Sequence, residues 1–307
     1  MHNVRGYFFI IGATVFWGVS ATVAKFLFTQ NISPIVLVQM RMTVSCFVIV
    51  VAFLLYDRSV FRIAIKDLPR FAILGIVGIA GSNFTYYYII HATNVATGIL
   101  IQYMAPLIVL GYAVLTRDEE INFVKFLAAI VSLAGCYLAV SGERISFHNL
   151  SEFGIAMCVA SPVVWAINNI VLRQILNSYR VWTVTIYAFI FGTLFWFFLI
   201  PPWKIIEVDY PLKTWEIFFA VGMISVLIPH SLYFIGAQHL TASRAIITAT
   251  FEPVVAIGSA FFFLGELLTP VQIAGAAIVI SAIVILQYKP ETAPIIIVRG
   301  TDQAKSS

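Results

Sequence analysis

Charged residues are scarce in this sequence. Of its 307 residues, 18 are Lys or Arg and 14 are Asp or Glu, so charged residues make up 10% of the chain. A typical soluble domain has about 25% charged residues. Hydrophobic residues make up 61%, and the mean hydropathy is +0.97. A water-soluble chain of this length could not bury so much apolar surface. The composition therefore excludes a soluble enzyme or a nucleic-acid-binding domain and predicts that lipid surrounds most of the chain.

Residues that form disulfides, metal sites or catalytic sites are also scarce. The three cysteines, Cys46, Cys136 and Cys158, lie far apart in apolar stretches, which is typical of small buried hydrophobic residues rather than of disulfides. The five histidines lack the spacing of metal ligands, and no glycine-rich phosphate loop is present. No Asp lies in the long apolar segments. We therefore predict no metal, no cofactor and no enzymatic activity, with a membrane-embedded enzyme as a less favoured alternative.

Long apolar runs are what the sequence has in abundance. A membrane-crossing helix needs roughly 20 mostly apolar residues. Such segments occur at 6–28, 34–56, 71–91, 95–115, 123–141, 153–175, 182–202, 215–237, 244–264 and 270–288. The first is too long for the apolar region of a signal peptide and is predicted to be a retained span. The fold class predicted is an all-α membrane protein with ten transmembrane helices, followed by a disordered cytoplasmic tail at 290–307.

The positions of Lys and Arg predict the orientation. If the N-terminus is cytoplasmic, thirteen Lys and Arg residues fall in inner segments, whereas the outer loops hold only Arg144, Lys204 and Lys213. Cytoplasmic loops of membrane proteins carry the excess of positive residues. We therefore expect both termini to be cytoplasmic, with the protein a multi-pass component of the cytoplasmic membrane.

The two halves of the chain resemble each other. At offsets of 147 or 148 residues the matching pairs are Trp17 and Trp165, Lys25 and Arg173, Asn83 and His230, Tyr86 and Tyr233, Pro106 and Pro253, and Glu119 and Glu266. This predicts two repeats, 1–142 and 151–289, each of five spans. Because five is odd, the second repeat must cross the membrane in the opposite sense. Inverted repeats of this kind are typical of transporters that alternate between inward-open and outward-open states.

Several motifs resemble a known family. Trp17-Gly18, Lys25, Pro34 and Arg41 look like the first-repeat pattern of the EamA family in the drug/metabolite transporter superfamily. The stretch Phe251-Glu252-Pro253 through Gly265-Glu266, Leu268-Thr269, Gln272 and Gly275 resembles the closing pattern of that family still more closely. The resemblance covers about 7–288. It implies a ten-helix 5+5 carrier that moves small polar metabolites or amino acids, often outward.

Three charged residues sit clearly inside the predicted spans, where charge is costly and such residues are therefore candidates for function. Glu252 is predicted to bind a substrate ammonium group or to exchange a proton, and the alternative is a buried structural carboxylate. Lys25 is a candidate clamp for a substrate carboxylate, although it could instead extend to the membrane interface. Arg41 is a candidate for the same clamp, but a structural role, bonding carbonyl groups at a helix end, is favoured for it.

Polar and aromatic side chains within the spans complete the predicted binding site. For at least some of them, anchoring at the membrane interface is a poor explanation. Deeper in the membrane, hydrogen-bonding groups need partners and rings can stack on cargo, and ordinary helix packing is the alternative for each. These candidates are Trp17, Asn83, Tyr86, Tyr87, Gln102, Tyr103, Trp165, Asn168, Asn169, His230, Tyr233 and Thr248. Pro106, Pro253, Glu119 and Glu266 are predicted to be structural.

The function predicted is secondary-active or facilitative transport of a small metabolite by alternating access. Amino acids are the leading substrate class, and export is favoured only through the family resemblance. A passive channel is the main alternative. The expected partners are the small-molecule substrate and the lipid bilayer, with proton coupling left open, no nucleic acid, and no oligomeric state predicted.

Overall fold

A computed structural model of the protein describes residues 2–29, 33–117, 119, 122–140, 150–208, 210–259, 261–262 and 267–288. The described residues form helices and no strand. Two short 3₁₀ helices, η1 and η2, and two π-helical stretches, η3 and η4, interrupt the α-helices. The elements are α1 (His2–Thr29), α2 (Pro34–Tyr56), η1 (Arg58–Phe61), η2 (Ile65–Asp67), α3 (Leu68–Ala72), η3 (Ile73–Gly81), α4 (Ser82–Ala92), α5 (Val95–Gln102), α6 (Ala105–Thr116), α7 (Phe123–Ala139), α8 (Glu152–Leu176), α9 (Val181–Leu199), α10 (Pro202–Ile206), α11 (Leu212–Gly222), η4 (Met223–Leu227), α12 (Ile228–Ala237), α13 (Ala242–Ala249), α14 (Glu252–Ser259) and α15 (Pro270–Tyr288).

Seven helical stretches of the described chain are long and apolar enough to cross a membrane. Val4–Ser20 and Phe123–Ala139 are apolar but shorter. These helices fit the predicted class, an all-α membrane protein. The spans found are Pro34–Tyr56, Ile65–Ala92, Val95–Thr116, Glu152–Leu176, Val181–Leu199, Leu212–Ala237 and Pro270–Gln287.

Helix starts follow local sequence signals. Ser33 caps α2 by accepting a hydrogen bond from the backbone N–H of Val36 at 3.3 Å, and Pro34 occupies the first helical position. At the start of α15, the Gln272 side chain accepts from the Thr269 backbone N–H at 2.9 Å, while the Thr269 hydroxyl accepts from the Gln272 N–H. This reciprocal pair is a capping box. Both starts were predicted from sequence, and both are confirmed.

The segment predicted at 95–115 is found as the candidate span Val95–Thr116, but it and the segment predicted at 244–264 each contain a helix break that was not predicted. The first stretch breaks at Tyr103 and Met104, between α5 and α6, and the second breaks at Thr250 and Phe251, between α13 and α14. Pro106 and Pro253 explain the breaks, because each lacks the N–H that would bond the carbonyl four residues earlier. Each proline is instead the second residue of the following helix, where a missing donor is tolerated.

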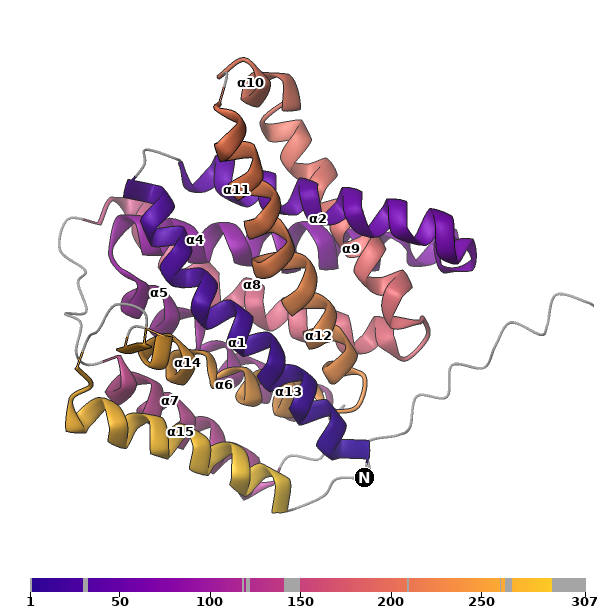
Figure 1. The fold of residues 1–307 in the computed structure, drawn as a ribbon. Coiled ribbons are helices and arrows are strands. Elements are labelled where there is room, and N and C mark those ends of the chain that lie inside the picture. Colours follow the sequence, from indigo (N-terminus) through magenta and orange to yellow (C-terminus); the bar gives the residue numbers. More distant parts are fainter. Residues whose placement is uncertain are drawn as a thin grey trace, which may run out of the picture.

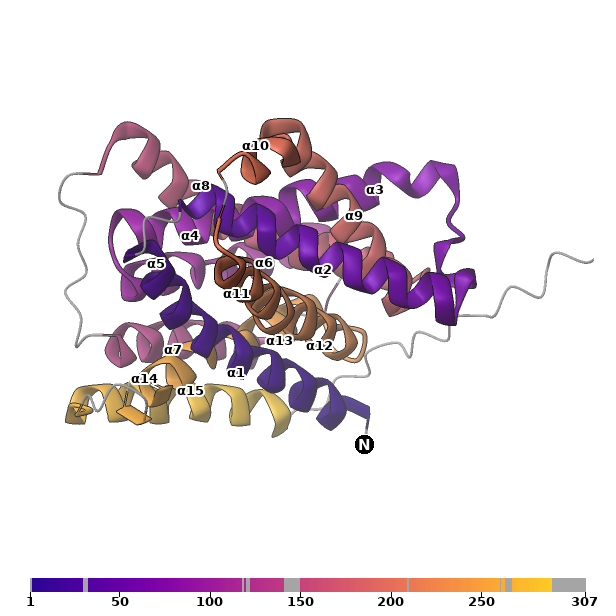
Figure 2. The same ribbon diagram turned by 45° about the horizontal axis from the view of Figure 1, so that its top comes forward.

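Helices from the two halves of the chain pack against each other rather than forming separate bodies. α1 lies along α12 and α14, η3 lies against α8 and α9, and α2 packs on α9 and α11. α7 and α15 run side by side at one edge of the molecule (Figures 1 and 2). Gly18 permits the close contact between α1 and α14, since a Cβ there would lie 2.9 Å from the Val255 side chain. The two halves therefore share one interior.

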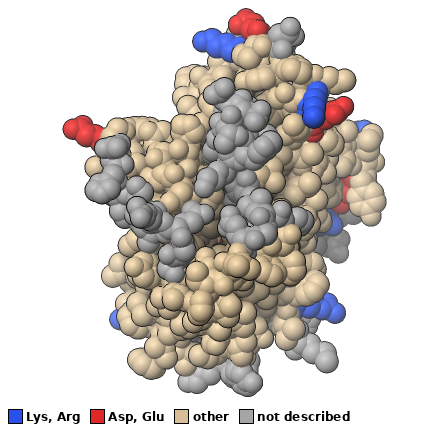
Figure 3. Space-filling view, turned by 60° about the vertical axis from the view of Figure 1, so that its left-hand side comes forward, with Lys and Arg blue, Asp and Glu red and all other residues tan. Residues whose placement is uncertain are grey.

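The surface is largely apolar. Side chains such as Phe8, Leu55, Leu115, Phe198 and Phe262 are each more than 70% exposed. Figure 3 shows one face on which the coloured Lys, Arg, Asp and Glu lie mostly toward the margins, while nearly all other described residues in view are uncharged. A water-soluble protein rarely exposes so extensive an apolar surface, so this face suits a lipid environment.

Candidate substrate-binding cavity

The helices line a cavity whose atom-free space, including the part that is open to solvent, is about 410 Å³. Its lining residues come from α1, α2, α4, α5, α8, α12 and α14 and from the turn between α5 and α6, so both halves of the chain contribute. Two of the lining residues, Tyr103 and Glu252, lie at the helix breaks. The lining residues are Trp17, Arg41, Ser82, Asn83, Tyr86, Tyr87, Gln102, Tyr103, Trp165, His230 and Glu252.

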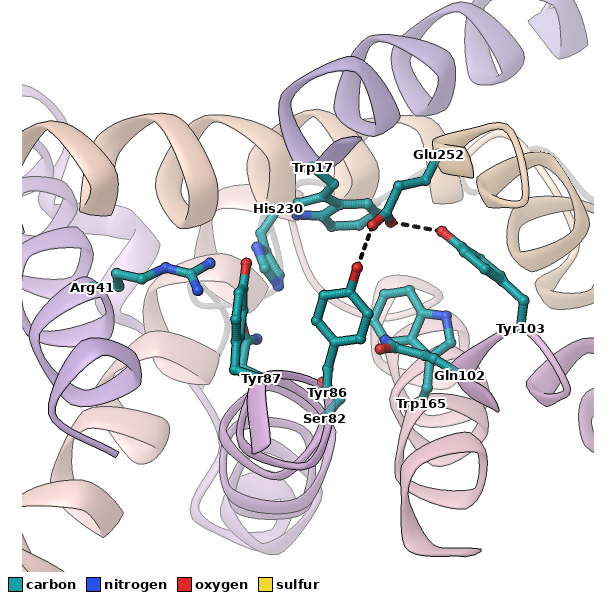
Figure 4. Close-up of a pocket in the computed structure, with 11 residues that line it drawn as sticks. Trp17, Arg41, Ser82, Tyr86, Tyr87, Gln102, Tyr103, Trp165, His230 and Glu252 are labelled. Carbon is teal, nitrogen blue, oxygen red and sulfur yellow. Dashed lines mark hydrogen bonds between the residues drawn. The ribbon is translucent and has the colours of Figure 1, made fainter. Parts of the chain in front are cut away.

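Glu252 reaches the cavity from the first position of α14 (Figure 4). The Tyr86 hydroxyl donates to its Oε1 at 2.8 Å, and the Tyr103 hydroxyl donates to its Oε2 at 2.7 Å. The residue is 6% exposed, and no ion pair within the described chain includes it. A buried carboxylate usually pairs with a cation, whereas here two hydroxyl groups donate to it instead. A ligand with a positive group would supply that missing cation.

Arg41 approaches the cavity from α2, at the end away from Glu252 (Figure 4). Its side chain is 1% exposed, its Nη2 donates to the Ser225 carbonyl at 3.2 Å, and its guanidinium carbon lies 4.3 Å from the centre of the Tyr87 ring. Its Nε and Nη1 have no hydrogen-bond partner. A buried donor without a partner is costly, and a guanidinium pairs most strongly with a carboxylate or phosphate. An anionic ligand group would satisfy these donors.

Uncharged polar atoms of the same wall are also unpaired. The Gln102 Oε1 and the Trp165 Nε1 are buried and have no hydrogen-bond partner. Gln102 offers an acceptor and Trp165 offers a donor. The cavity therefore carries positive, negative and neutral hydrogen-bonding groups, as a ligand with several polar groups would require.

Aromatic rings form another part of the wall. The Trp17 ring lies 5.7 Å from the Trp165 ring, 5.3 Å from the His230 ring and 5.3 Å from the Tyr233 ring. The His230 Nδ1 pairs with the Val226 carbonyl at 3.0 Å, which fixes the imidazole in place. These large, rigid surfaces suit the apolar part of a ligand.

Nine of the residues predicted to bind substrate line this cavity. They are Trp17, Asn83, Tyr86, Tyr87, Gln102, Tyr103, Trp165, His230 and Glu252.

Four of the other predicted residues lie outside the lining of this cavity. The Tyr233 hydroxyl donates to the Asn169 side-chain oxygen, outside the cavity lining. Asn168 is fully buried against Gly78, and the Thr248 hydroxyl donates to the Arg244 carbonyl at 2.7 Å. The side chain of Lys25 lies outside the described residues.

Two cavity residues were not among the predicted binding residues. A structural role was favoured for Arg41 over a clamp for a substrate carboxylate, but Arg41 lines the cavity as well as contacting Ser225 and Tyr87. Ser82 was not singled out. Its spacing of four residues from Tyr86 places both on one face of α4 and was the signal that could have found it.

Pro106 and Pro253, predicted to be structural, lie just after the two helix breaks, and Glu119 lies between α6 and α7. Glu119 accepts from the Ser243 backbone N–H at 3.1 Å and from the Ser243 hydroxyl, and it pairs with the Lys125 Nζ at 3.3 Å. These contacts tie the loop before α7 to the start of α13. Glu266 lies outside the described residues.

Comparison with known proteins identifies the family. The model of the EamA-like transporter family matches residues 4–141 and again residues 152–288. The chain belongs to the EamA-like transporter family. It is therefore a multi-pass membrane transporter, which embeds in a bilayer and moves a small molecule.

Relatives of this EamA-family chain are named as transporters. The uncharacterized inner membrane transporter YicL of Salmonella typhimurium is 23% identical over 92% of this chain and 95% of its own length. An uncharacterized transporter of Archaeoglobus fulgidus is 27% identical over 68% of this chain and 75% of its own. The threonine/homoserine exporter RhtA of Escherichia coli is 25% identical over 67% of each chain.

A solved crystal structure shares the fold of this EamA-family chain. It superposes with a TM-score of 0.72, covers 94% of this chain and 96% of its own, and is 17% identical in sequence. At this level of identity the likeness concerns the fold alone.

Proposed function

We propose that this EamA-family transporter carries an α-amino acid, whose carboxylate binds Arg41 and whose ammonium group binds Glu252. One observation carries the proposal. Two buried groups of opposite charge, which are not paired with each other, face a single aromatic-walled cavity from opposite ends (Figure 4). A zwitterion satisfies both groups at once, whereas a simple cation or anion satisfies one. The RhtA relatives are named as exporters of threonine and homoserine, which are amino acids of this kind.

The transport cycle we propose is alternating access by two inverted five-span repeats, with both termini in the cytoplasm and the protein in the cytoplasmic membrane. Equivalent irregularities in the two halves support the repeats. The helix break at Tyr103–Met104 matches the one at Thr250–Phe251, and the π-helical stretch η3 matches η4. Interrupted helices at a central site are typical of such transporters. The two separate family matches also support the repeats.

Export and proton coupling belong to the same proposal. The name of the RhtA relatives favours export. Glu252 is the candidate coupling group, because a proton and a substrate ammonium group would compete for one buried carboxyl group. Tyr86 and Tyr103 hold that group in either case.

The proposal is tested by counterflow in proteoliposomes. Purified protein is reconstituted into vesicles loaded with unlabelled L-threonine, and entry of labelled L-threonine or L-homoserine is followed, with a wider amino-acid panel as competitors. The expected result is saturable, trans-stimulated entry. Flux that rises linearly with concentration, without trans-stimulation, would indicate a channel instead. No entry and no competition across the whole panel would refute the amino-acid assignment.

A further inference from the structure

Binding of the two charged groups of an amino acid leaves two polar atoms of the central cavity without a role. The side-chain oxygen of Gln102 and the indole N–H of Trp165 are both buried and have no hydrogen-bond partner in the part of the chain that the structure describes. The first is an acceptor and the second is a donor. Because both residues line the central cavity, a bound ligand can supply the missing partners.

The two side chains come from helices that pack on each other. Gln102 is the last residue of α5, and Trp165 lies in the middle of α8, which contacts α5. Gln102 directly precedes Tyr103, whose hydroxyl donates to Glu252 at 2.7 Å. Figure 4 shows both side chains on the Glu252 side of the view, apart from Arg41. The side chain of an amino acid branches from the carbon that bears the ammonium group, so an ammonium group at Glu252 brings the side chain toward this pair.

The helix break after α5 does not require a glutamine at position 102. The equivalent residue in the second half of the chain, 147 positions later, is Ala249. Ala249 is likewise the last residue of a helix, α13, directly before a break. Since that break forms without a side-chain amide, the amide of Gln102 is an additional polar group in one half of the cavity.

The donor of the pair is held in place by neighbouring rings. The Trp165 ring lies 5.7 Å from the Trp17 ring and 5.6 Å from the Tyr233 ring, and the residue is 4% exposed. This packing keeps the indole N–H inside the protein, where a donor without a partner costs free energy. A ligand group that accepts a hydrogen bond removes this cost.

We propose that Gln102 and Trp165 select amino acids whose side chain carries a group that both donates and accepts hydrogen bonds. A hydroxyl or a carboxamide does so, donating to the Gln102 oxygen and accepting from the Trp165 N–H. An apolar side chain of the same size leaves both atoms unpaired, and a site built for a polar group rejects such an analogue for that reason. This inference rests on the proposed function, because it assumes an amino acid held by Arg41 and Glu252.

The test is competition for counterflow of labelled L-threonine, and in parallel of labelled L-asparagine, by amino acids paired by size. L-Threonine has a hydroxyl where L-valine has a methyl group, and L-asparagine has a carboxamide where L-leucine has an isopropyl group. The wild type is expected to bind the polar member of at least one pair about tenfold more tightly, as read from the inhibition constants. A preference for threonine alone identifies a hydroxyl as the recognised group, and a preference for asparagine alone identifies a carboxamide.

Two variants assign the preference to these residues. Gln102→Leu removes the acceptor and Trp165→Phe removes the donor while keeping a ring, so each should reduce the preference severalfold. In Gln102→Leu the apolar member of the pair should bind no more weakly than in the wild type, whereas general damage to the cavity would weaken both members alike. Gln287→Leu is the matched control, because Gln287 is an exposed residue of α15 outside the cavity.

Two outcomes would overturn the inference. Equal binding of both members of both pairs by the wild type would mean that the cavity does not recognise a polar side chain. A wild-type preference that survives in both variants would mean that other residues recognise it. If neither variant folds, Gln102→Met, which keeps an unbranched side chain and lacks the amide, decides in the same way. Failure of every amino acid to compete would refute the proposed function itself, whereas competition without a preference overturns only this inference.

Discussion

Replacing Glu252 by glutamine removes the negative charge from the central cavity while keeping the size of the side chain. The carboxylate accepts hydroxyl hydrogen bonds at 2.8 and 2.7 Å, one on each oxygen. A glutamine amide has only one oxygen, so one tyrosine hydroxyl must turn to accept from the new NH₂ group. That change is local, and the variant should fold.

The effect on substrate binding should be much larger. A hydrogen bond between two charged groups contributes about 1.5–3 kcal/mol, and each 1.4 kcal/mol corresponds to about a tenfold change in affinity. If the substrate ammonium group binds Glu252, the KM for counterflow should rise roughly 10- to 150-fold in Glu252→Gln.

Glu216→Gln provides the control for this measurement. Glu216 is an exposed residue of α11 outside the central cavity, and the same chemical change there should leave the KM unaltered. Counterflow of labelled L-threonine into proteoliposomes gives the KM for all three proteins. A Glu252→Gln variant with wild-type KM, and normal thermal stability, would refute the assignment of Glu252 to the ammonium group.

Three further predictions follow from the same contacts. Arg41→Gln should raise the KM about tenfold or more, because it removes buried donors at the cavity. An unchanged KM would mean that Arg41 does not bind the substrate and serves only to bond the Ser225 carbonyl. Tyr233→Phe leaves the buried side-chain oxygen of Asn169 without its hydroxyl donor and should lower the free energy of unfolding by about 1–3 kcal/mol, seen as a lower midpoint in thermal unfolding; an unaltered midpoint would mean that this hydrogen bond adds nothing to stability. Glu119→Gln breaks a nearly buried ion pair and should lower the free energy of unfolding by roughly 3 kcal/mol, seen as a lower midpoint in thermal unfolding; an unaltered midpoint would mean that its contacts with Ser243 suffice.

The helical segments were predictable because lipid imposes them. A backbone in hydrocarbon must satisfy its own hydrogen bonds, so long apolar runs such as 34–56 and 182–202 form helices at nearly the predicted boundaries. The breaks after Gln102 and Ala249 were not predicted, because a proline inside an apolar run either kinks a helix or starts a new one. Which of the two occurs depends on packing against neighbouring helices.

The candidate site was predictable in part for a similar reason. Polar residues within spans must find partners, and this requirement singled out Glu252 and the tyrosines that bond it. Helical spacing gives the face of a residue but not its partner. Asn169 and Tyr233 were therefore expected in the cavity although they bond each other beside it. Arg41 was judged by its position near a helix end, whereas the fold directs its side chain inward.

The central claim is that one cavity recognises both charges of an amino acid, with Arg41 at one end and Glu252 at the other. The most direct test is inhibition of L-threonine counterflow by analogues that lack either the amino group or the carboxyl group, in the wild type and in Arg41→Gln and Glu252→Gln. The account predicts that the wild type rejects both analogues. Glu252→Gln should no longer discriminate against the analogue without the amino group, and Arg41→Gln should no longer discriminate against the one without the carboxyl group. If both variants retain the wild-type discrimination, these residues do not recognise the charges of the substrate, and the account is wrong.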